Sequence, residues 1–185
     1  MMNKQIYKNS IDSPFYCQES LECPENLKFL FKEGYSKRAG IIPYYVSRNG
    51  NLYLLLGRTI YFENKDRPLS DFGGGCKKYE NPVDCAVREF EEETRRVVNI
   101  DLKNTKYIYI TGKQNPHQVI FLVKMSHMDL NIDDKFQASK PKNEREQEMD
   151  RLEWRNVRNL KKLHKFKFTH SIRSLINNFN LYSIQ

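Results

Sequence analysis

The sequence predicts a mixed α/β domain, because strand-like runs come first and then alternate with amphipathic helices. The chain has 185 residues, of which 39% are hydrophobic. That length suffices for one buried core and is short for two ordinary domains. Residues 1–36 show no clear periodicity, so we expect an N-terminal extension over 1–36 that packs on one domain over 37–185.

Two strands at the start of that domain are the clearest local prediction. The runs 38–46 and 51–57 are rich in Ile, Leu, Tyr and Val, residues that fit a pleated, half-buried surface. They are joined at Asn49-Gly50, and an Asn-Gly pair between two apolar runs is a strong hairpin signal. Further strands are expected at 106–111, at 117–125 and around 152–154.

The first helix is predicted to begin at Asn81. Asn81 suits the N-cap, Pro82 suits the first helical position, and Asp84 places a negative charge in the first turn. A helical period of buried side chains follows at Val83, Ala86, Val87, Phe90, Thr94 and Val97. We expect shorter helical segments near 156–165 and 168–182, and a long polar loop over 129–149.

Positive charge dominates the composition. Lys and Arg total 31 against 23 Asp and Glu, which gives a net charge of +8 and a pI near 9.2. This excess favours a polyanionic partner such as phosphates or nucleic acid. No apolar run approaches the roughly 18–20 residues of a membrane span, and the first residues lack the apolar segment of a signal peptide. We therefore expect a cytoplasmic protein that binds no membrane.

The helix that begins at Asn81 carries three carboxylates on one face. At 100° per residue, Glu92 lies about 60° to one side of Glu89 and Glu93 lies about 40° to the other. Their Cβ atoms are expected to be roughly 5–6 Å apart, so the like charges repel one another unless a cation lies between them. Mg²⁺ typically binds through such carboxylates together with phosphate oxygens of a substrate.

A simpler interpretation is a solvated helix face, because Glu91 and Glu92 each have an arginine four residues later, an ordinary ion-pair spacing. The residues around the carboxylates favour the metal site. They read G-x5-E-x7-R-E-F-x-E-E, with the fixed positions at Gly74, Glu80, Arg88, Glu89, Phe90, Glu92 and Glu93. This pattern resembles the Nudix box, G-x5-E-x7-R-E-U-x-E-E-x-G-U, in which U is a bulky apolar residue.

The resemblance implies an α/β/α sandwich with a mixed sheet, in which the box forms a loop–helix–loop catalytic motif. Nudix hydrolases cleave a diphosphate bond in a nucleoside diphosphate linked to a further group X, and they use Mg²⁺ or Mn²⁺. Carried over residue by residue, the implied metal ligands are Glu89, Glu92 and Glu93, and Glu89 can instead act as the base. Such a metal neutralises charge on the phosphates and lowers the pKa of a bound water.

The resemblance also implies supporting roles for three residues of the box and for Gly73, which directly precedes it. Arg88 and Glu80 are expected to form an ion pair that orients the metal ligands. Gly73 and Gly74 are expected to let the backbone approach the phosphates or the metal closely.

An additional catalytic carboxylate is expected outside the box, as is common in this family. Glu148 lies six residues before Trp154, a spacing that resembles the family's approach to its last strand. Glu144 and Glu146 compete with Glu148 for this role, and solvated loop charges are the simpler interpretation of all three.

The chain departs from the family pattern at the end of the box. Arg95 stands where the family has a glycine, and Arg96 stands where it has an apolar residue. That glycine lets the chain leave the helix with a positive φ, which an arginine adopts only at a cost. We therefore expect the helix to continue to Val97 or Val98, with Asn99 in the left-handed conformation.

Among possible substrates, the basic balance of the chain favours a capped RNA. The candidate RNA-binding residues are Lys161, Lys162, Lys165 and Lys167. The box is also similar to that of mRNA-decapping members of the family. One alternative is a pyrophosphatase for free nucleotides, dinucleoside polyphosphates, nucleotide sugars or inositol pyrophosphates. Another is a Nudix-fold module that binds RNA or nucleotides without catalysis. The resemblance allows a homodimer.

Overall fold

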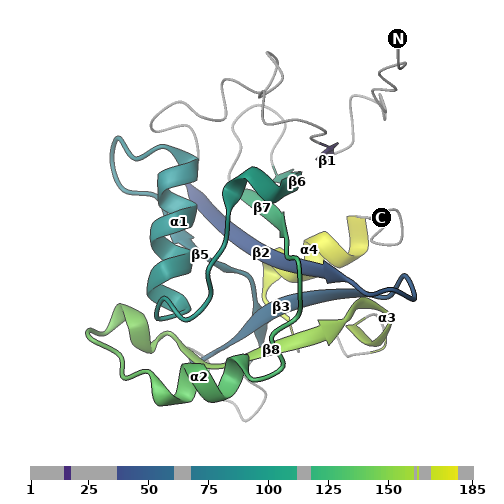
Figure 1. The fold of residues 1–185 in the computed structure, drawn as a ribbon. Coiled ribbons are helices and arrows are strands. Elements are labelled where there is room, and N and C mark those ends of the chain that lie inside the picture. The colour runs from purple at the N-terminus through teal and green to yellow at the C-terminus, as the bar shows by residue number, and fades with distance from the viewer. Residues whose placement is uncertain are drawn as a thin grey trace.

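A computed structural model of the chain shows one mixed β-sheet between two layers of helices (Figure 1). The structure describes residues 15–17, 37–60, 68–111, 118–160, 162 and 168–178. The strands are β1 (Phe15–Cys17), β2 (Arg38–Val46), β3 (Leu52–Thr59), β4 (Leu69–Ser70), β5 (Phe72–Gly75), β6 (Thr105–Thr111), β7 (Gln118–Lys124) and β8 (Met149–Asn156). The helices are α1 (Pro82–Glu93), α2 (Ile132–Ala138), α3 (Val157–Leu160) and α4 (His170–Asn178), with 3₁₀ turns η2 (Leu102–Asn104) and η3 (Arg145–Gln147).

Strand β2 lies at the centre of the sheet. The main path runs β1-β6-β7-β2-β3-β4, while β5 pairs with β2 and β8 pairs with β3. Among the described pairs of strands, only β2–β7 is parallel, so the sheet is mixed. The predicted hairpin between β2 and β3 is confirmed, and Gly50 takes the positive φ of 71° that its turn requires.

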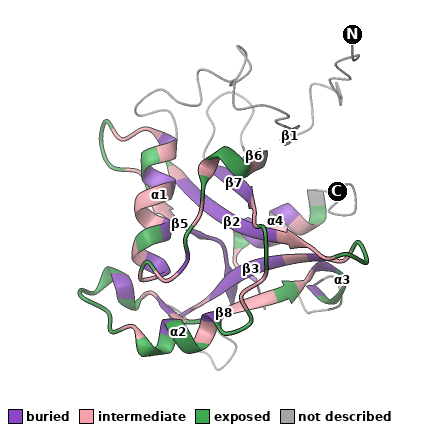
Figure 2. Ribbon diagram, viewed as in Figure 1, coloured by how far each residue is buried: buried purple, intermediate pink, exposed green. Residues whose placement is uncertain are grey.

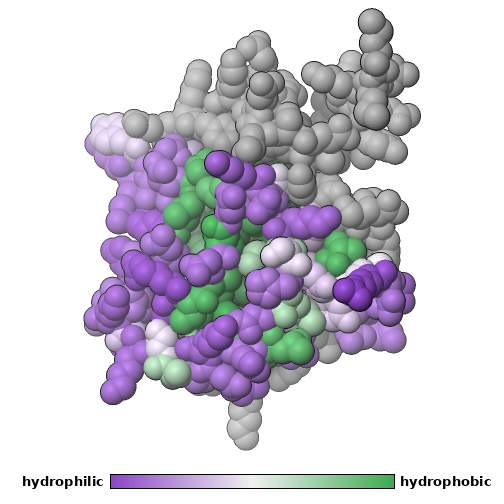
Figure 3. Space-filling view, viewed as in Figure 1, coloured by the Kyte–Doolittle hydropathy of each residue, from purple (hydrophilic) through white to green (hydrophobic). Residues whose placement is uncertain are grey.

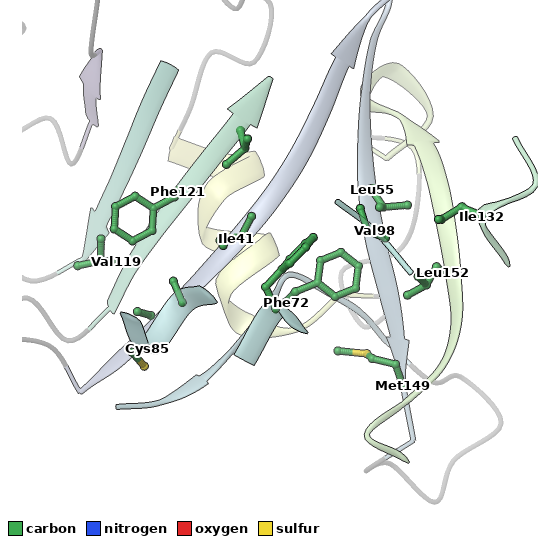
Figure 4. Packing of buried hydrophobic residues seen from close by; sticks show 14 of the residues in the cluster. Ile41, Leu55, Phe72, Cys85, Val98, Val119, Phe121, Ile132, Met149 and Leu152 are labelled. Carbon is green, nitrogen blue, oxygen red and sulfur yellow. The ribbon is translucent and has the colours of Figure 1, made fainter. Parts of the chain in front are cut away.

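Alternating side chains divide the core into two clusters, one on each face of the sheet. Ile41 of β2 and Leu55 of β3 pack with α1 and α2, as do neighbouring apolar residues. Ile42 and Leu54, one position away on the same strands, pack in the second cluster with α3 and α4. Figure 4 shows Phe72 of β5 between Ile41 and Leu55 in the first cluster. The predicted α/β/α sandwich is confirmed.

The start of α1 follows the prediction. Asn81 caps the helix, since its Oδ1 accepts hydrogen bonds from the amides of Val83 and Asp84 at 2.9 Å each. Phe90 of α1 packs edge-on against Phe72 of β5, with ring centroids 5.4 Å apart. These contacts fix one helix face to the sheet, and Figure 2 shows the exposed and intermediate residues of α1 on its outer side.

The expected extension of α1 to Val97 or Val98 is wrong. The helix ends at Glu93, and Arg95 and Arg96 both have positive φ, at 50° and 58°. The amide of Arg95 donates to the carbonyl of Glu92 and the amide of Arg96 to that of Glu91, which is the Schellman pattern of a helix end. Arg95 therefore takes the conformation of the family's glycine, at a cost that its side-chain contacts offset.

Three further sequence predictions need correction or lie outside the described residues. The polar segment 129–149 is not a long loop, because it contains α2 and η3, and α2 buries Ile132 and Phe136 against the core. Of the two expected C-terminal helical segments, the structure describes α3 over Val157–Leu160 and α4 over His170–Asn178, and residues 161, 163–167 and 179–182 lie outside the described residues. Of the predicted extension 1–36, the structure describes only β1, which pairs antiparallel with β6. Among the described residues, no helix is both long and apolar enough to cross a bilayer.

Candidate functional site

The site is built where β5 runs into the loop before α1. The amide of Gly73 donates to Oε2 of Glu93 at 2.7 Å, so strand and helix are joined directly at a carboxylate. Glu93 is only 4% exposed. Burial raises the pKa of the Glu93 carboxyl well above its usual range, and the negative charge of Asp71 raises it further, whereas Arg38 opposes the shift. A buried carboxylate with one hydrogen bond is poised to gain from a positive partner.

Glu89 lies one turn before Glu93 and against the backbone of β5. A side chain built at Gly74 would place its Cβ 2.5 Å from the Glu89 carboxyl group, so Gly74 leaves the room that this carboxylate occupies. Burial raises the pKa of Glu89, and the charges of Glu92 and Glu148 add to the shift, although Arg88 opposes it. Glu92 and Glu148 therefore each repel the carboxylate of Glu89.

The three glycines of β5 give a graded prediction. Gly74→Ala is expected to displace the flexible end of Glu89 and to lower activity by about 10²-fold, the scale of a 1 Å misplacement, with little change in stability. Gly73→Ala is expected to destabilise the fold by about 1–3 kcal/mol, because its Cβ would meet backbone atoms of β2 at 2.4–2.5 Å. Gly75→Ala is the matched control, since nothing lies within 4 Å of its Cβ.

Steady-state rates and thermal melts of the three glycine variants check this. Equal losses of activity in Gly74→Ala and Gly75→Ala would contradict the placement of Glu89 against Gly74.

Arg88 of α1 contacts three carboxylates of the box, those of Glu80, Glu89 and Glu92. Its Nε and Nη2 each contact the carboxylate of Glu80 at 2.8 Å, and its Nη1 lies 2.5 Å from Glu89 and 3.4 Å from Glu92. The two-pronged contact with Glu80 has the geometry of the strongest arginine–carboxylate pairs. Glu80 also accepts the amide of Lys77 at 2.8 Å, which anchors the loop before α1. The side chain of Arg88 thus joins that loop to two carboxylates of the helix.

The Arg88–Glu80 pair predicts a pH dependence of stability. Hydrogen bonds from Arg88 lower the pKa of Glu80 from 4.5 to about 2. Since the folded state has the lower pKa, the pair stabilises the fold above pH 4.5, and this contribution is lost as the pH falls towards 2. With allowance for solvent screening, we expect it to be on the order of 1 kcal/mol.

The measurement is the unfolding free energy of the wild type and of Glu80→Gln between pH 7 and pH 2. The difference between the two proteins should be constant above pH 5 and should shrink below it. A difference that grows on acidification would contradict this assignment.

Of the three carboxylates proposed outside the box, Glu148 is the one whose charge acts on the site. Its negative charge raises the pKa of both Glu89 and Glu93. Glu146 is instead buried at 2% exposure, where it accepts the amide of Lys142 at 2.7 Å and pairs with Arg96 at 2.9 Å. Glu144 is exposed at the start of η3.

A partly buried ion pair, Arg38–Asp71, lies next to Gly73, the residue whose amide binds Glu93. Asp71 is fully buried and accepts Nη1 and Nη2 of Arg38 at 2.7 and 3.1 Å. The hydroxyl of Ser171, on α4, donates to Asp71 at 2.5 Å. Arg38 Nη2 also donates to the carbonyl of Gly73 at 2.7 Å. The pair therefore connects β2, β5 and α4 at the residue that binds Glu93.

The donor chemistry of these residues fits a hard divalent cation. Carboxylate oxygens are the ligands that Mg²⁺ and Mn²⁺ prefer. Glu89 and Glu93 are each repelled by nearby carboxylates, Glu148 among them, and a bound cation would relieve this repulsion. Within the described ranges, no three His, Cys, Asp or Glu side chains are gathered in an arrangement that could hold a metal ion. The Arg88 contacts with Glu89 and Glu92 account for this in part, because they turn both carboxylates towards the guanidinium.

The remaining sequence-predicted residues are only partly within reach of the structure. Lys162 is exposed in a turn after α3, and Lys161, Lys165 and Lys167 lie outside the described residues.

On the face seen in Figure 3, hydrophilic side chains surround a hydrophobic stripe that runs beside α1. The sequence analysis missed Arg38, Asp71 and the contacts of Arg95. A charged residue that opens an otherwise apolar strand, as Arg38 does, is a usable signal for a buried ion pair.

Comparison with known proteins gives one matching family and several solved structures of similar fold. The NUDIX domain family matches residues 36–178. The search of curated proteins returned no match.

Solved structures of similar fold include hydrolases of this family. An Ap4A hydrolase from C. elegans is 18% identical, with 77% of this chain and 93% of that chain covered and a TM-score of 0.45. The Nudix hydrolase RenU from M. smegmatis is 13% identical over 72% of this chain and 79% of that chain, with a TM-score of 0.46. A MutT/nudix family protein from Listeria innocua is 15% identical over 76% and 88%, with a TM-score of 0.43.

Proposed function

Since the chain belongs to the Nudix family and is a Nudix hydrolase, we propose that it cleaves a diphosphate bond with Mg²⁺ or Mn²⁺ bound by Glu89, Glu92 and Glu93. Members of this family act on nucleoside diphosphates linked to a further group. The observation that carries the proposal is the cluster of carboxylates at the junction of β5 and α1, where Glu93 is buried and Glu89 and Glu148 repel each other. A bound divalent cation would offset that repulsion and would supply charge neutralisation and an activated water.

The remaining catalytic and positioning roles fall to residues inside and outside the box. We assign to Glu148 the acceptance of the proton of the attacking water. Its negative charge raises the pKa of Glu89 and of Glu93 from a different segment of the chain, which supports this assignment. Arg88 and Glu80 hold the loop before α1 against the helix. Gly73 orients Glu93 through its amide, and Gly74 leaves space for Glu89. These are positioning roles that keep the carboxylates in register with a diphosphate.

For the substrate we propose a capped RNA. The net charge of +8 supports it, because the carboxylates of the site are themselves negative and the excess of Lys and Arg lies outside the site. Exposed Lys162 and the predicted lysines near it would contact the phosphates of the RNA beyond the cap.

A substrate panel tests this proposal. Purified protein with Mg²⁺ or Mn²⁺ is given labelled m7G-capped RNA, diadenosine tetraphosphate, a nucleotide sugar and an inositol pyrophosphate. We expect release of the cap nucleotide from RNA, with a rate that falls as salt is added. Faster turnover of a free dinucleotide, with capped RNA untouched, would overturn the RNA assignment and leave the reaction class intact. Binding of RNA without hydrolysis of any member would overturn the enzyme mechanism.

A further inference from the structure

Arg95 makes an unusual set of contacts for a residue at a helix end. Its guanidinium donates to four backbone carbonyls, which belong to Phe136 at 3.2 Å, Ser139 at 2.9 Å, Glu146 at 3.0 Å and Met149 at 3.3 Å. It also lies over the ring of Phe136, 3.9 Å from the ring centroid. One side chain at the end of α1 thus binds α2, η3 and the start of β8.

Two of these carbonyls lie on either side of Glu148. Glu146 is two residues before it and Met149 is the residue after it. The carbonyl of Glu148 itself accepts the amide of Ile60, the residue after β3, at 3.0 Å. The backbone that carries Glu148 is therefore held from the helix that carries the box carboxylates and from the sheet.

The backbone of Arg95 has the left-handed conformation that the family's glycine would adopt without strain. A non-glycine residue in the left-handed region costs roughly 1–2 kcal/mol, and Arg95 adopts a φ of 50° there. Arg96 has a φ of 58°, and among the described residues its side chain pairs with the carboxylates of Glu91 and Glu146. The two arginines have the same charge and similar φ angles. Of the two, only Arg95 donates hydrogen bonds to the carbonyls of Glu146 and Met149, which lie on either side of Glu148.

We propose that Arg95 is a positioning residue that fixes Glu148 relative to Glu89 and Glu93 by holding the backbone on both sides of Glu148. The inference rests on the proposed function, because it assigns Arg95 to the placement of the proposed base. A glycine at this position would end the helix equally well and would leave the segment 144–149 without this clamp.

The test compares Arg95→Gly, Glu148→Gln and the double variant with capped RNA and Mg²⁺. Arg95→Gly should fold, because glycine adopts a φ of 50° without strain. We expect its kcat to fall by about 10²-fold with KM changed less than about threefold, as for a misplaced catalytic group. In the double variant, kcat should equal that of Glu148→Gln alone, since a residue that acts through Glu148 has nothing left to position.

Hydrogen exchange gives a second readout that needs no substrate. Arg95→Gly should speed exchange of the amides of residues 146–149. The control on the same helix is Glu91→Gln, because Glu91 is half exposed and pairs with Arg96 rather than with residues 146–149. It should change neither this exchange nor kcat by more than about threefold. Unchanged exchange and kcat in Arg95→Gly would overturn the inference, as would additive losses in the double variant or equal losses in Glu91→Gln. If Glu148→Gln is fully active, the proposed base is wrong and the inference falls with it. If wild type hydrolyses nothing, the proposed function fails, and the exchange data alone then decide whether Arg95 holds this segment.

Discussion

Glu93→Gln is expected to lower the rate of metal-dependent diphosphate hydrolysis by about 10³-fold, or roughly 4 kcal/mol of transition-state stabilisation. The glutamine keeps the shape of the side chain, and its carbonyl oxygen can still accept the amide of Gly73, which now lies 2.7 Å from Glu93. It removes a buried negative charge that repels Asp71. The melting temperature of Glu93→Gln should therefore match or exceed that of the wild type, although activity is lost.

The matched control for this prediction is Glu91→Gln. Glu91 lies on the same helix, but its side chain is half exposed and pairs with Arg96 at 3.4 Å. We expect its activity to stay within about threefold of the wild type, as for a weak surface pair. Steady-state rates with saturating Mg²⁺ and thermal melts of both variants make the comparison. If Glu93→Gln keeps its activity, or if Glu91→Gln loses as much, the metal ligands are wrongly assigned.

Asp71→Ala should give the largest loss of stability, about 3–5 kcal/mol in the unfolding free energy. Asp71 is fully buried, and its carboxylate is the partner of the Arg38 guanidinium, whose side chain is 26% exposed. Without that carboxylate, a positive charge is left in a poorly solvated place, and the hydroxyl of Ser171 loses its acceptor. Because Arg38 also binds the carbonyl of Gly73, we expect the metal site to lose its order together with the fold.

Lys135→Ala is the matched control, because it removes an ion pair that is exposed to solvent. Lys135 pairs with Asp129 at 2.5 Å, but the two side chains are 58% and 27% exposed. Its removal should cost less than about 1 kcal/mol. Chemical denaturation of Asp71→Ala, Lys135→Ala and the wild type measures both effects. Similar unfolding free energies for the two variants would show that the Arg38–Asp71 pair is not the stabilising element we describe.

The sequence was sufficient for the mixed α/β class and for the start of the box helix, because both depend on local signals, whereas the α/β/α sandwich was implied by the resemblance to the Nudix family. The alternation of Ile41 and Ile42 fixes which side chains meet which layer, and the caps at Asn81 and Pro82 need only their immediate neighbours. Such signals can be seen in a single sequence.

The end of the helix and the surroundings of the site could not be predicted in this way. Arg95 looks unfavourable in the left-handed conformation until its four acceptors, 41 to 54 residues away along the chain, are known. The same holds for Asp71, whose partners Arg38 and Ser171 are 33 and 100 residues away. In both cases tertiary contacts outweigh the local preference of the residue.

The central claim is that a divalent cation bound by carboxylates drives the cleavage of a diphosphate bond. Its most direct test is the rate of hydrolysis of the substrate panel by one protein preparation, first in EDTA and then with Mg²⁺ or Mn²⁺ restored. The account predicts no turnover in EDTA and full recovery with either cation in the wild type, with no recovery in Glu93→Gln. Hydrolysis that proceeds unchanged in EDTA, or that returns equally in Glu93→Gln, would contradict it.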